Sequence, residues 1–225
     1  PPVGVRSGPG LMISWSLKTA PTRTMLEILD SAGTVLRTFE PDTAKPDSTA
    51  GARAGGGRRG GETFLPKNAG LNRLTWDLRA QGITSFPGMI FWGGGTAGPA
   101  VPPGRYAVRL TADGRRLTAP IVVRRNPYLP EVTDADMAAQ FAFSKRVRDK
   151  ANEANLAVIA IRRVKEQLAN RLTKAPDDAA LKSTGAELKT NASAVEENVY
   201  QVRNQSGQDP LNFPIKVNNR LATLL

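Results

Sequence analysis

Cysteine and histidine are both absent from this chain of 225 residues. Without cysteine it has no disulfide, no thiolate nucleophile and no cysteine-ligated zinc or iron–sulfur site. Without histidine it has no imidazole general base, no Ser-His-Asp or Cys-His triad and no histidine-ligated metal. These absences exclude the commonest hydrolytic and metal chemistries. They favour a non-catalytic binding or structural module that carries no cofactor.

Long apolar runs and a leader segment are also missing. The longest apolar stretches fall far short of the roughly 20 residues that a membrane-spanning helix needs. The chain opens with Pro1-Pro2 and shows no basic region followed by an apolar signal region. We therefore expect no transmembrane segment, and we expect the chain to be an internal or processed piece of a longer protein.

Positive charge is what the chain has in excess, with 31 Lys and Arg against 20 Asp and Glu. The first 130 residues hold 17 of the basic and 8 of the acidic residues, so most of the excess lies there. No RNA-binding aromatic signature, helix-turn-helix or zinc knuckle accompanies the charge. We therefore expect a solvated basic surface or an acidic protein partner rather than nucleic acid.

Alternating apolar side chains predict short strands in the first half of the chain. Ile13, Trp15 and Leu17 recur at every second position, which is the period of a half-buried strand. Asp113-Gly114 is the strongest hairpin signal in the chain. Six or seven such strands separated by turns favour an antiparallel β-sandwich over residues 1–126.

Two irregular stretches interrupt this strand pattern. Residues 41–62 are rich in Gly, Ala, Pro and Thr and have too little apolar surface to order themselves, so we expect a flexible insertion. Glycines and prolines also forbid a long element within residues 82–103. Both stretches are expected to be loops that the sandwich presents to solvent.

Helical periodicity replaces the strand pattern after Pro130, and it defines a second domain at 131–225. A capping box at Thr133–Asp136 opens a helix predicted over about 133–174. A second helix is predicted over about 177–204, after a short turn. Two helices joined in this way predict an antiparallel α-helical hairpin, which the C-terminal tail returns to cover.

One apolar cluster stands inside the irregular stretch and is the candidate surface for contact with a partner. Its members are Phe86, Met89, Ile90, Phe91 and Trp92. Such a cluster either covers the end of the sandwich or forms an exposed contact patch. The Asp134/Asp136 and Asp177/Asp178 pairs are weaker candidates for calcium, because carboxylates at helix starts satisfy free N–H groups. We assign no catalytic, cofactor or metal residue.

Four segments of the first half resemble the Ig-like module of flagellar hook-capping proteins. They are residues 13–17, 29–35, 72–77 and 101–106. The resemblance implies that the sandwich is Ig-like. Where that module has Trp-Asp-Gly, this chain has Trp76-Asp77-Leu78, so we expect the turn after Asp77 to differ.

Most of the chain is similar to the C-terminal region of bacterial sortilin-like proteins, which are exported β-propellers often labelled as glycosyl hydrolases. The matching segments are residues 70–79, 86–89, 103–106 and 210–219, of which the last is the most specific. The resemblance implies an exported chain in the periplasm or at the cell surface. It also implies an upstream propeller, whose residues and activity this sequence does not contain.

These patterns predict a non-catalytic module for protein–protein interaction or assembly, the C-terminal part of a larger exported sortilin-like protein. One version is an accessory subunit docked on a large envelope or membrane complex. The alternative is a carbohydrate-binding or enzyme-accessory domain of an exported glycoside hydrolase-like protein, in which Phe91, Trp92 and Tyr106 would stack on sugars. An enzyme in its own right is not expected.

Overall fold

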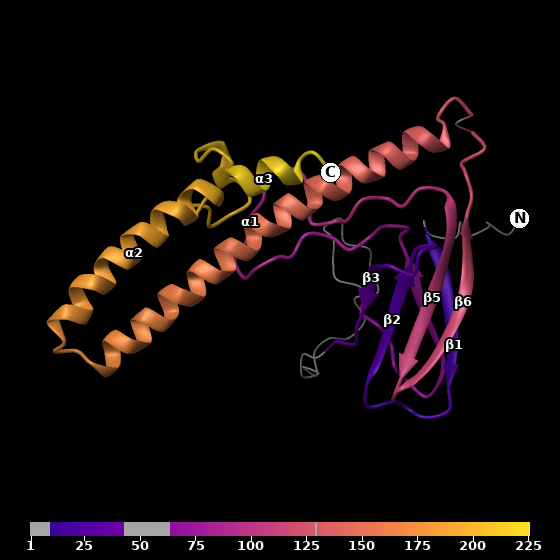
Figure 1. Cartoon of the computed structure of the whole chain (residues 1–225), viewed down its shortest axis with the longest axis horizontal. Coiled ribbons are helices and arrows are strands. Elements are labelled where there is room, and N and C mark those ends of the chain that lie inside the picture. The colour runs from indigo at the N-terminus through magenta and orange to yellow at the C-terminus, as the bar shows by residue number, and fades with distance from the viewer. Residues whose placement is uncertain (1–9, 43–63, 129) are drawn as a thin grey trace, which may run out of the picture. The chain divides into compact units, whose positions relative to one another are not determined.

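The structure, a computed structural model, describes residues 10–42, 64–128 and 130–225. This part of the chain is a mixed β/α fold with two antiparallel sheets and three α-helices (Figure 1). Nearly all of the insertion predicted at 41–62 lies outside the described residues. The described residues divide into two compact units: unit 1 lies within 1–81 and 99–141, and unit 2 within 82–98 and 142–225.

The smaller sheet of unit 1 consists of β1 (Leu11–Leu17) and β4 (Gly70–Trp76), which run antiparallel. Half-buried and exposed positions alternate along β1, as the period-two pattern of its sequence predicts. The inward positions of β4 are Asn72, Leu74 and Trp76, and all three are buried.

The larger sheet of unit 1 has the order β3-β2-β5-β6, with every pair antiparallel. Its strands are β2 (Thr24–Leu29), β3 (Val35–Phe39), β5 (Gly104–Ala112) and β6 (Arg115–Val123). Asp113 and Gly114 join β5 to β6, and both have positive φ, at 44° and 83°. A tight two-residue hairpin turn of type I′ needs positive φ at both positions, so the predicted hairpin is confirmed.

Trp76 is the centre of the unit 1 core. It is fully buried among Leu26, Ile28 and Tyr106, and its ring meets that of Tyr106 edge to face at 6.1 Å. The indole N–H donates to the Arg79 carbonyl at 2.8 Å, so the one polar atom of this side chain is satisfied.

Leu78, which follows Trp76-Asp77, has a left-handed backbone conformation with φ at 58°, a region that glycine occupies readily. The Asp77 carboxylate accepts from the Arg79 N–H at 3.1 Å, and the Leu78 carbonyl accepts from the Val101 N–H at 2.8 Å. The expectation that this turn differs from that of the Ig-like module stays a prediction. Bonds on both sides of Leu78 hold it in a strained region that leucine rarely occupies.

Unit 2 contains most of α1 (Asp134–Lys174), together with α2 (Ala179–Val199), the 3₁₀ turn η1 (Asp209–Leu211) and α3 (Val217–Ala222). Thr133 and Asp136 exchange the reciprocal bonds of the predicted capping box. The second helix ends at Val199, five residues before its predicted end, because Tyr200 adopts an extended conformation.

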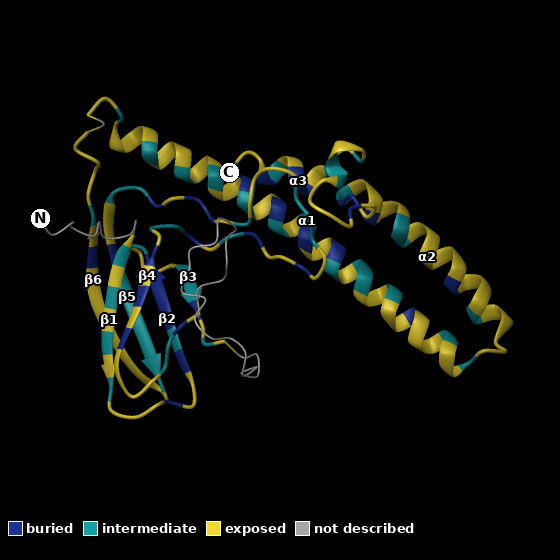
Figure 2. Ribbon diagram, turned by 180° about the vertical axis from the view of Figure 1, so that it is seen from behind, coloured by how far each residue is buried: buried dark blue, intermediate teal, exposed yellow. Residues whose placement is uncertain are grey.

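The buried residues of α1 recur at helical spacing along one side, while the rest of α1 and α2 is largely exposed (Figure 2). They are Val147, Ala151, Asn155, Val158 and Leu168. Within the residues that the structure describes, no helix is apolar over a length that would cross a membrane.

Candidate protein-contact surface

All five residues of the predicted contact cluster lie in the segment 82–98, which belongs to unit 2 and has no helix or strand. The structure gives them different environments. Phe86 is buried, with 6% of its surface exposed, whereas Met89, Ile90 and Phe91 are half-buried. Trp92 is 42% exposed. The cluster is therefore divided between a core residue, three intermediate residues and one exposed aromatic ring.

Phe86 packs into a small core of unit 2 between the helices. It contacts Val158 of α1 and Tyr200, whose ring meets that of Phe86 edge to face at 5.0 Å. The guanidinium of Arg162 stacks over the Phe86 ring at 4.7 Å. Phe86 thus anchors the segment, and its ring is buried within unit 2.

Side chains of α1 bind the backbone of the segment next to this anchor. The side-chain oxygen of Asn152 accepts from the Thr84 N–H at 2.9 Å, and the side-chain amide of Asn155 donates to the Thr84 carbonyl at 2.8 Å. Arg162 donates to the Pro87 carbonyl at 3.2 Å. These bonds satisfy backbone groups that no helix or strand pairs.

The hydroxyl of Tyr200 holds the middle of the segment. It donates to the Gly88 carbonyl at 3.0 Å and accepts from the Ile90 N–H at 3.1 Å. Tyr200 directly follows the last residue of α2. The C-terminal end of α2 therefore holds this segment in place.

Two asparagines of α3 complete the attachment. Asn219 accepts from the Trp92 N–H at 2.7 Å and donates to the Gly93 carbonyl at 3.2 Å. Asn218 donates to the side-chain oxygen of Asn155 at 2.9 Å, and both of these amides are fully buried. The backbone on each side of the Trp92 side chain is therefore fixed, although its ring is exposed.

Gly94 allows the segment to approach α3 closely. Its φ is 62°, and a β-carbon built there would lie 2.6 Å from the Ala222 carbonyl oxygen. Only glycine fits such a position without moving backbone. Within the run Gly93–Gly95, Gly94 therefore has a packing role against α3.

Glu196 of α2 is the buried charge of unit 2, and it ties the two long helices together. Arg162 and Lys165 of α1 each donate to its carboxylate at 2.7 Å. Burial alone would raise the pKa of Glu196. The hydrogen bonds from Lys165 and Arg162, with their positive charges, outweigh burial and hold that pKa below its ordinary value.

The anchoring residues were not assigned from the sequence. Asn155 carries a signal that could have found it, because a polar residue occupies an apolar position of the α1 stripe between Ala151 and Val158. Asn218 and Asn219 are the last two residues of the segment 210–219, which carries the most specific part of the sortilin-like resemblance. Nothing in the local pattern marks Asn152 or Tyr200 as a backbone anchor.

Tyr106, the third aromatic residue of the carbohydrate-binding alternative, is part of the unit 1 core. It is buried, and its hydroxyl donates to the Pro102 carbonyl at 2.7 Å. Its ring faces Trp76 and offers no free face to a sugar. Within the described ranges 10–42, 64–128 and 130–225, no three Asp or Glu residues gather as a group that could hold a metal ion.

Comparison of the chain with known protein families, with curated proteins and with solved structures finds no match.

Proposed function

We propose that this chain is a non-catalytic module for protein–protein interaction or assembly. The observation that carries the proposal is the exposed indole of Trp92 on a backbone fixed by Asn219. Exposed tryptophans are enriched among residues that dominate binding energy at protein interfaces. A fixed backbone lowers the entropy lost on binding, so such a residue binds a protein partner efficiently.

Apolar side chains of α3 and of the residues just after it are also exposed. The backbone of residues 92–94 runs beside α3, where Gly93 and Gly94 approach Thr223 and Ala222. Val217 and Leu224 are exposed, and with the half-buried Leu221 they follow the spacing of one helical face. We propose that Trp92 and this face form the contact surface.

The finer architecture is part of the same proposal. We infer that the two sheets of unit 1 form an Ig-like β-sandwich, which is supported by a core shared between Trp76 of β4 and Leu26 of β2. We infer that α1 and α2 form an antiparallel hairpin, which is supported by the ion pairs of Glu196 with Arg162 and Lys165. The tail that carries α3 would return onto that hairpin through Asn218 and Asn155.

The placement of the chain rests on its resemblance to sortilin-like proteins. We propose that it is the C-terminal part of a larger exported protein, in the periplasm or at the cell surface. Its partners would then be its own upstream propeller or a large envelope or membrane complex on which it acts as an accessory subunit.

The test is site-specific crosslinking in the cells that produce the parent protein. A photoreactive amino acid is placed at Trp92 in one variant and at Leu188 in a control, since Leu188 is 45% exposed on α2. We expect a discrete protein partner to crosslink from position 92 and not from position 188. Crosslinks that are equal at both positions, or absent from both, would overturn the proposal.

Substitution of Trp92 by Ser supplies the quantitative form of this test. We expect co-purification of the partner that the crosslink identifies to fall about tenfold relative to the unsubstituted protein, because a central interface tryptophan commonly contributes more than about 1.4 kcal/mol. The melting temperature should hardly change, because the ring is exposed. A matching Leu188→Ser variant should bind normally. Phe91 is left intact, because it packs against the core formed by Ile83, Ala151 and Ala222.

A further inference from the structure

Strand β6 is the last strand of its sheet, and no strand among the described residues pairs with its outer edge. Seven of its nine residues are exposed and only Ile121 is buried. Leu117 and Val122 are 72% and 63% exposed, although both are strongly apolar. An edge strand of this length is a template on which another extended chain can pair.

Backbone alternation determines which groups of β6 face outward. In an antiparallel sheet each residue directs both its N–H and its C=O to the same neighbouring strand, and successive residues alternate. At the opposite edge of this sheet, the Leu36 carbonyl accepts from the Gln81 N–H at 2.7 Å, and the Thr38 N–H donates to the Gln81 side chain. The even-numbered residues of β3 therefore face away from β2.

The strand registers carry this alternation across the sheet to β6. Arg37 and Phe39 of β3 direct their backbone N–H and C=O groups toward Ile28 and Leu26 of β2. The β2 residue between Ile28 and Leu26 therefore directs its backbone groups toward β5. When the same alternation is followed across β5, the even-numbered residues of β6 direct their backbone groups away from β5. These residues are Arg116, Thr118, Pro120 and Val122. Pro120 agrees with this result, because proline has no N–H to donate to β5.

The surroundings of this edge are strongly basic. Residues 104–130 contain six arginines, one aspartate and no glutamate. That aspartate, Asp113, accepts from the backbone N–H groups of Thr22 and Arg23. Arg109 pairs with Glu27 at 2.8 Å and Arg125 with Asp134 at 3.4 Å.

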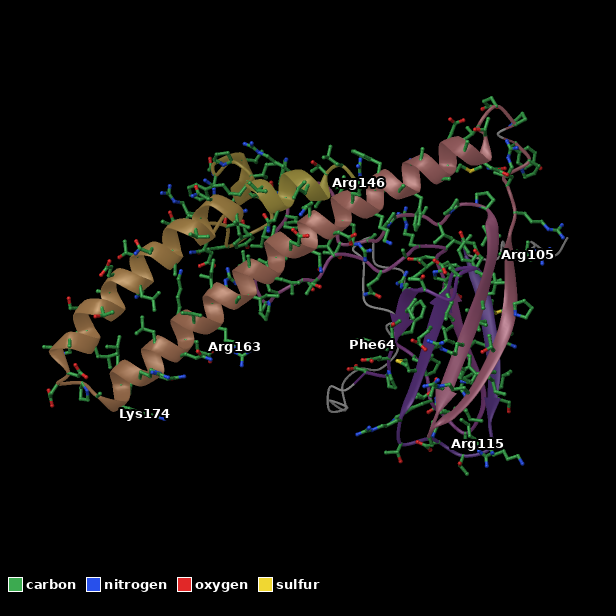
Figure 3. The ribbon with its side chains drawn as sticks, in the orientation of Figure 1. Phe64, Arg105, Arg115, Arg146, Arg163 and Lys174 are labelled. Atoms are coloured by element: carbon green, nitrogen blue, oxygen red, sulfur yellow. The ribbon has the colours of Figure 1, made fainter. Side chains whose placement is uncertain are left out.

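The other four arginines are exposed and have no carboxylate partner among the described residues. They are Arg105, Arg115, Arg116 and Arg124. Arg115 and Arg116 stand at the hairpin end of β6, whereas Arg105 and Arg124 stand at the other end. Figure 3 shows the side chains of Arg115 and Arg105 extending into solvent at these two ends.

We propose that the outer edge of β6 binds an extended acidic segment of a partner protein as an added β-strand. The backbone of that segment pairs with the outward C=O groups of β6 and with the outward N–H groups on either side of Pro120, which has none, and its flanking carboxylates pair with the arginines at both ends. The planar guanidinium of arginine binds carboxylates in a bidentate manner. Arg116 and Arg124 are about 27 Å apart along an extended strand, so the partner's acidic residues lie about eight residues apart.

Charge and chemistry select this occupant over two others. Antiparallel pairing of two β6 strands would bring Arg115 and Arg116 of one copy beside Arg124 of the other, and like charges across a strand pair are destabilising. Outward backbone groups match a peptide and not a nucleic acid. Strand β6 also has no aromatic side chain on which a base could stack.

This edge lies in unit 1 and shares no residue with the contact surface proposed at Trp92, Val217, Leu221 and Leu224. It gives the proposed interaction module a second binding surface with a partner of defined chemistry. The two proposals use separate variants, so either can fail without the other.

The probe is a fluorescein-labelled peptide of sequence Glu-Glu-Val-Thr-Val-Thr-Val-Glu-Glu, measured by anisotropy with the full chain at low salt. Its control has Lys in place of every Glu. We expect the acidic peptide to bind with a Kd below about 1 mM, and about tenfold more tightly than the basic peptide. Added salt should weaken this binding, since exposed charges are screened.

Two variants separate backbone pairing from charge. Thr118→Pro removes an outward N–H and leaves the pairing with β5 intact, so binding should weaken about tenfold with little change in melting temperature. Arg116→Glu with Arg124→Glu should also abolish most of the binding. Arg163→Glu with Arg171→Glu makes the same change of charge on α1 and should leave peptide binding unchanged.

Three outcomes would overturn the proposal. The first is no binding of the acidic peptide at about 1 mM, or equal binding of both peptides. The second is unchanged binding by Thr118→Pro together with unchanged binding by the double Arg→Glu variant. The third is a different occupant: oligothymidine bound more tightly than the acidic peptide, or a dimer in sedimentation that Thr118→Pro dissociates.

Discussion

Asparagine side chains determine the path of a segment that has no secondary structure of its own. An asparagine amide has both a donor and an acceptor, so one side chain can satisfy a backbone N–H and a neighbouring C=O together. Asn219 does this at Trp92 and Gly93. Asn155 and Asn218 can be fully buried because each is hydrogen-bonded to a fixed partner.

Substitution of Asn219 by Ala should free the backbone at Trp92. The Trp92 N–H and the Gly93 carbonyl would lose their partners, and we expect a loss of about 1–2 kcal/mol of stability. The amide of Trp92 should exchange with deuterium at least about tenfold faster, because its hydrogen bond limits exchange. Hydrogen exchange followed by mass spectrometry measures this directly.

Asn212→Ala is the matched control for this experiment. Asn212 lies in the same tail but is exposed. Its replacement should leave exchange at Trp92 unchanged. Equal exchange in Asn219→Ala and the unsubstituted protein would show that the segment is held by packing alone.

At the scale of the elements, one buried carboxylate connects the two long helices. Glu196 receives Arg162 and Lys165 from α1, and Arg162 also stacks on Phe86. The same arginine therefore joins α1, α2 and the segment 82–98. Gly185 of α2 shows the close approach of these helices, because a β-carbon there would lie 2.9 Å from the Leu168 side chain.

The lowered pKa of Glu196 predicts a specific dependence of stability on pH. A carboxyl with a lower pKa in the folded than in the unfolded state stabilises the fold above its unfolded pKa. That stabilisation is lost as the pH falls through the folded pKa. Glu196→Gln should therefore cost about 1–3 kcal/mol at pH 7, and the difference from the unsubstituted protein should shrink in acid.

Urea unfolding at a series of pH values measures this difference, with Glu197→Gln as the control. Glu197 is the adjacent residue of α2 and is exposed. Its replacement should cost little at any pH. A cost of Glu196→Gln that stayed constant down to acid pH would show that the lost interaction does not depend on the charge of the carboxylate.

At the scale of the whole molecule, the chain order and the compact units do not coincide. Unit 2 includes residues 82–98, which interrupt the part of the chain that forms unit 1. Ile83 and Phe86 from this segment fill the two small cores of unit 2, against Ala151 and Val158 of α1. Unit 2 is therefore incomplete without a segment from the β half of the sequence.

A fragment of residues 142–225 should accordingly be less stable than the same residues in the full chain. Addition of a peptide of residues 82–98 should raise its helical circular dichroism and its melting temperature, because the peptide restores both cores. The same peptide with Phe86→Ser is the control and should have a weaker effect. If the fragment melts identically with either peptide or with none, the segment does not stabilise unit 2.

Local patterns in the sequence were sufficient for the type and order of the main elements, although not for the end of α2. The alternation in residues 11–17, the Asp113-Gly114 turn and the capping box at Thr133 all depend on neighbours a few residues away. They predict antiparallel strands followed by helices, which the structure confirms at that level. The absence of cysteine and histidine likewise restricts the chemistry of the chain before any fold is known.

Only the tertiary structure decided which members of the apolar cluster are core and which are surface. The bonds that place Thr84 and Trp92 reach Asn152 and Asn219, which are 68 and 127 residues away in the sequence. The outward direction of Thr118 likewise depends on a hydrogen-bond alternation that starts at Gln81 and crosses four strands. Periodicity reports how one element divides between core and solvent, but it contains no information about partners that folding brings from distant parts of the chain.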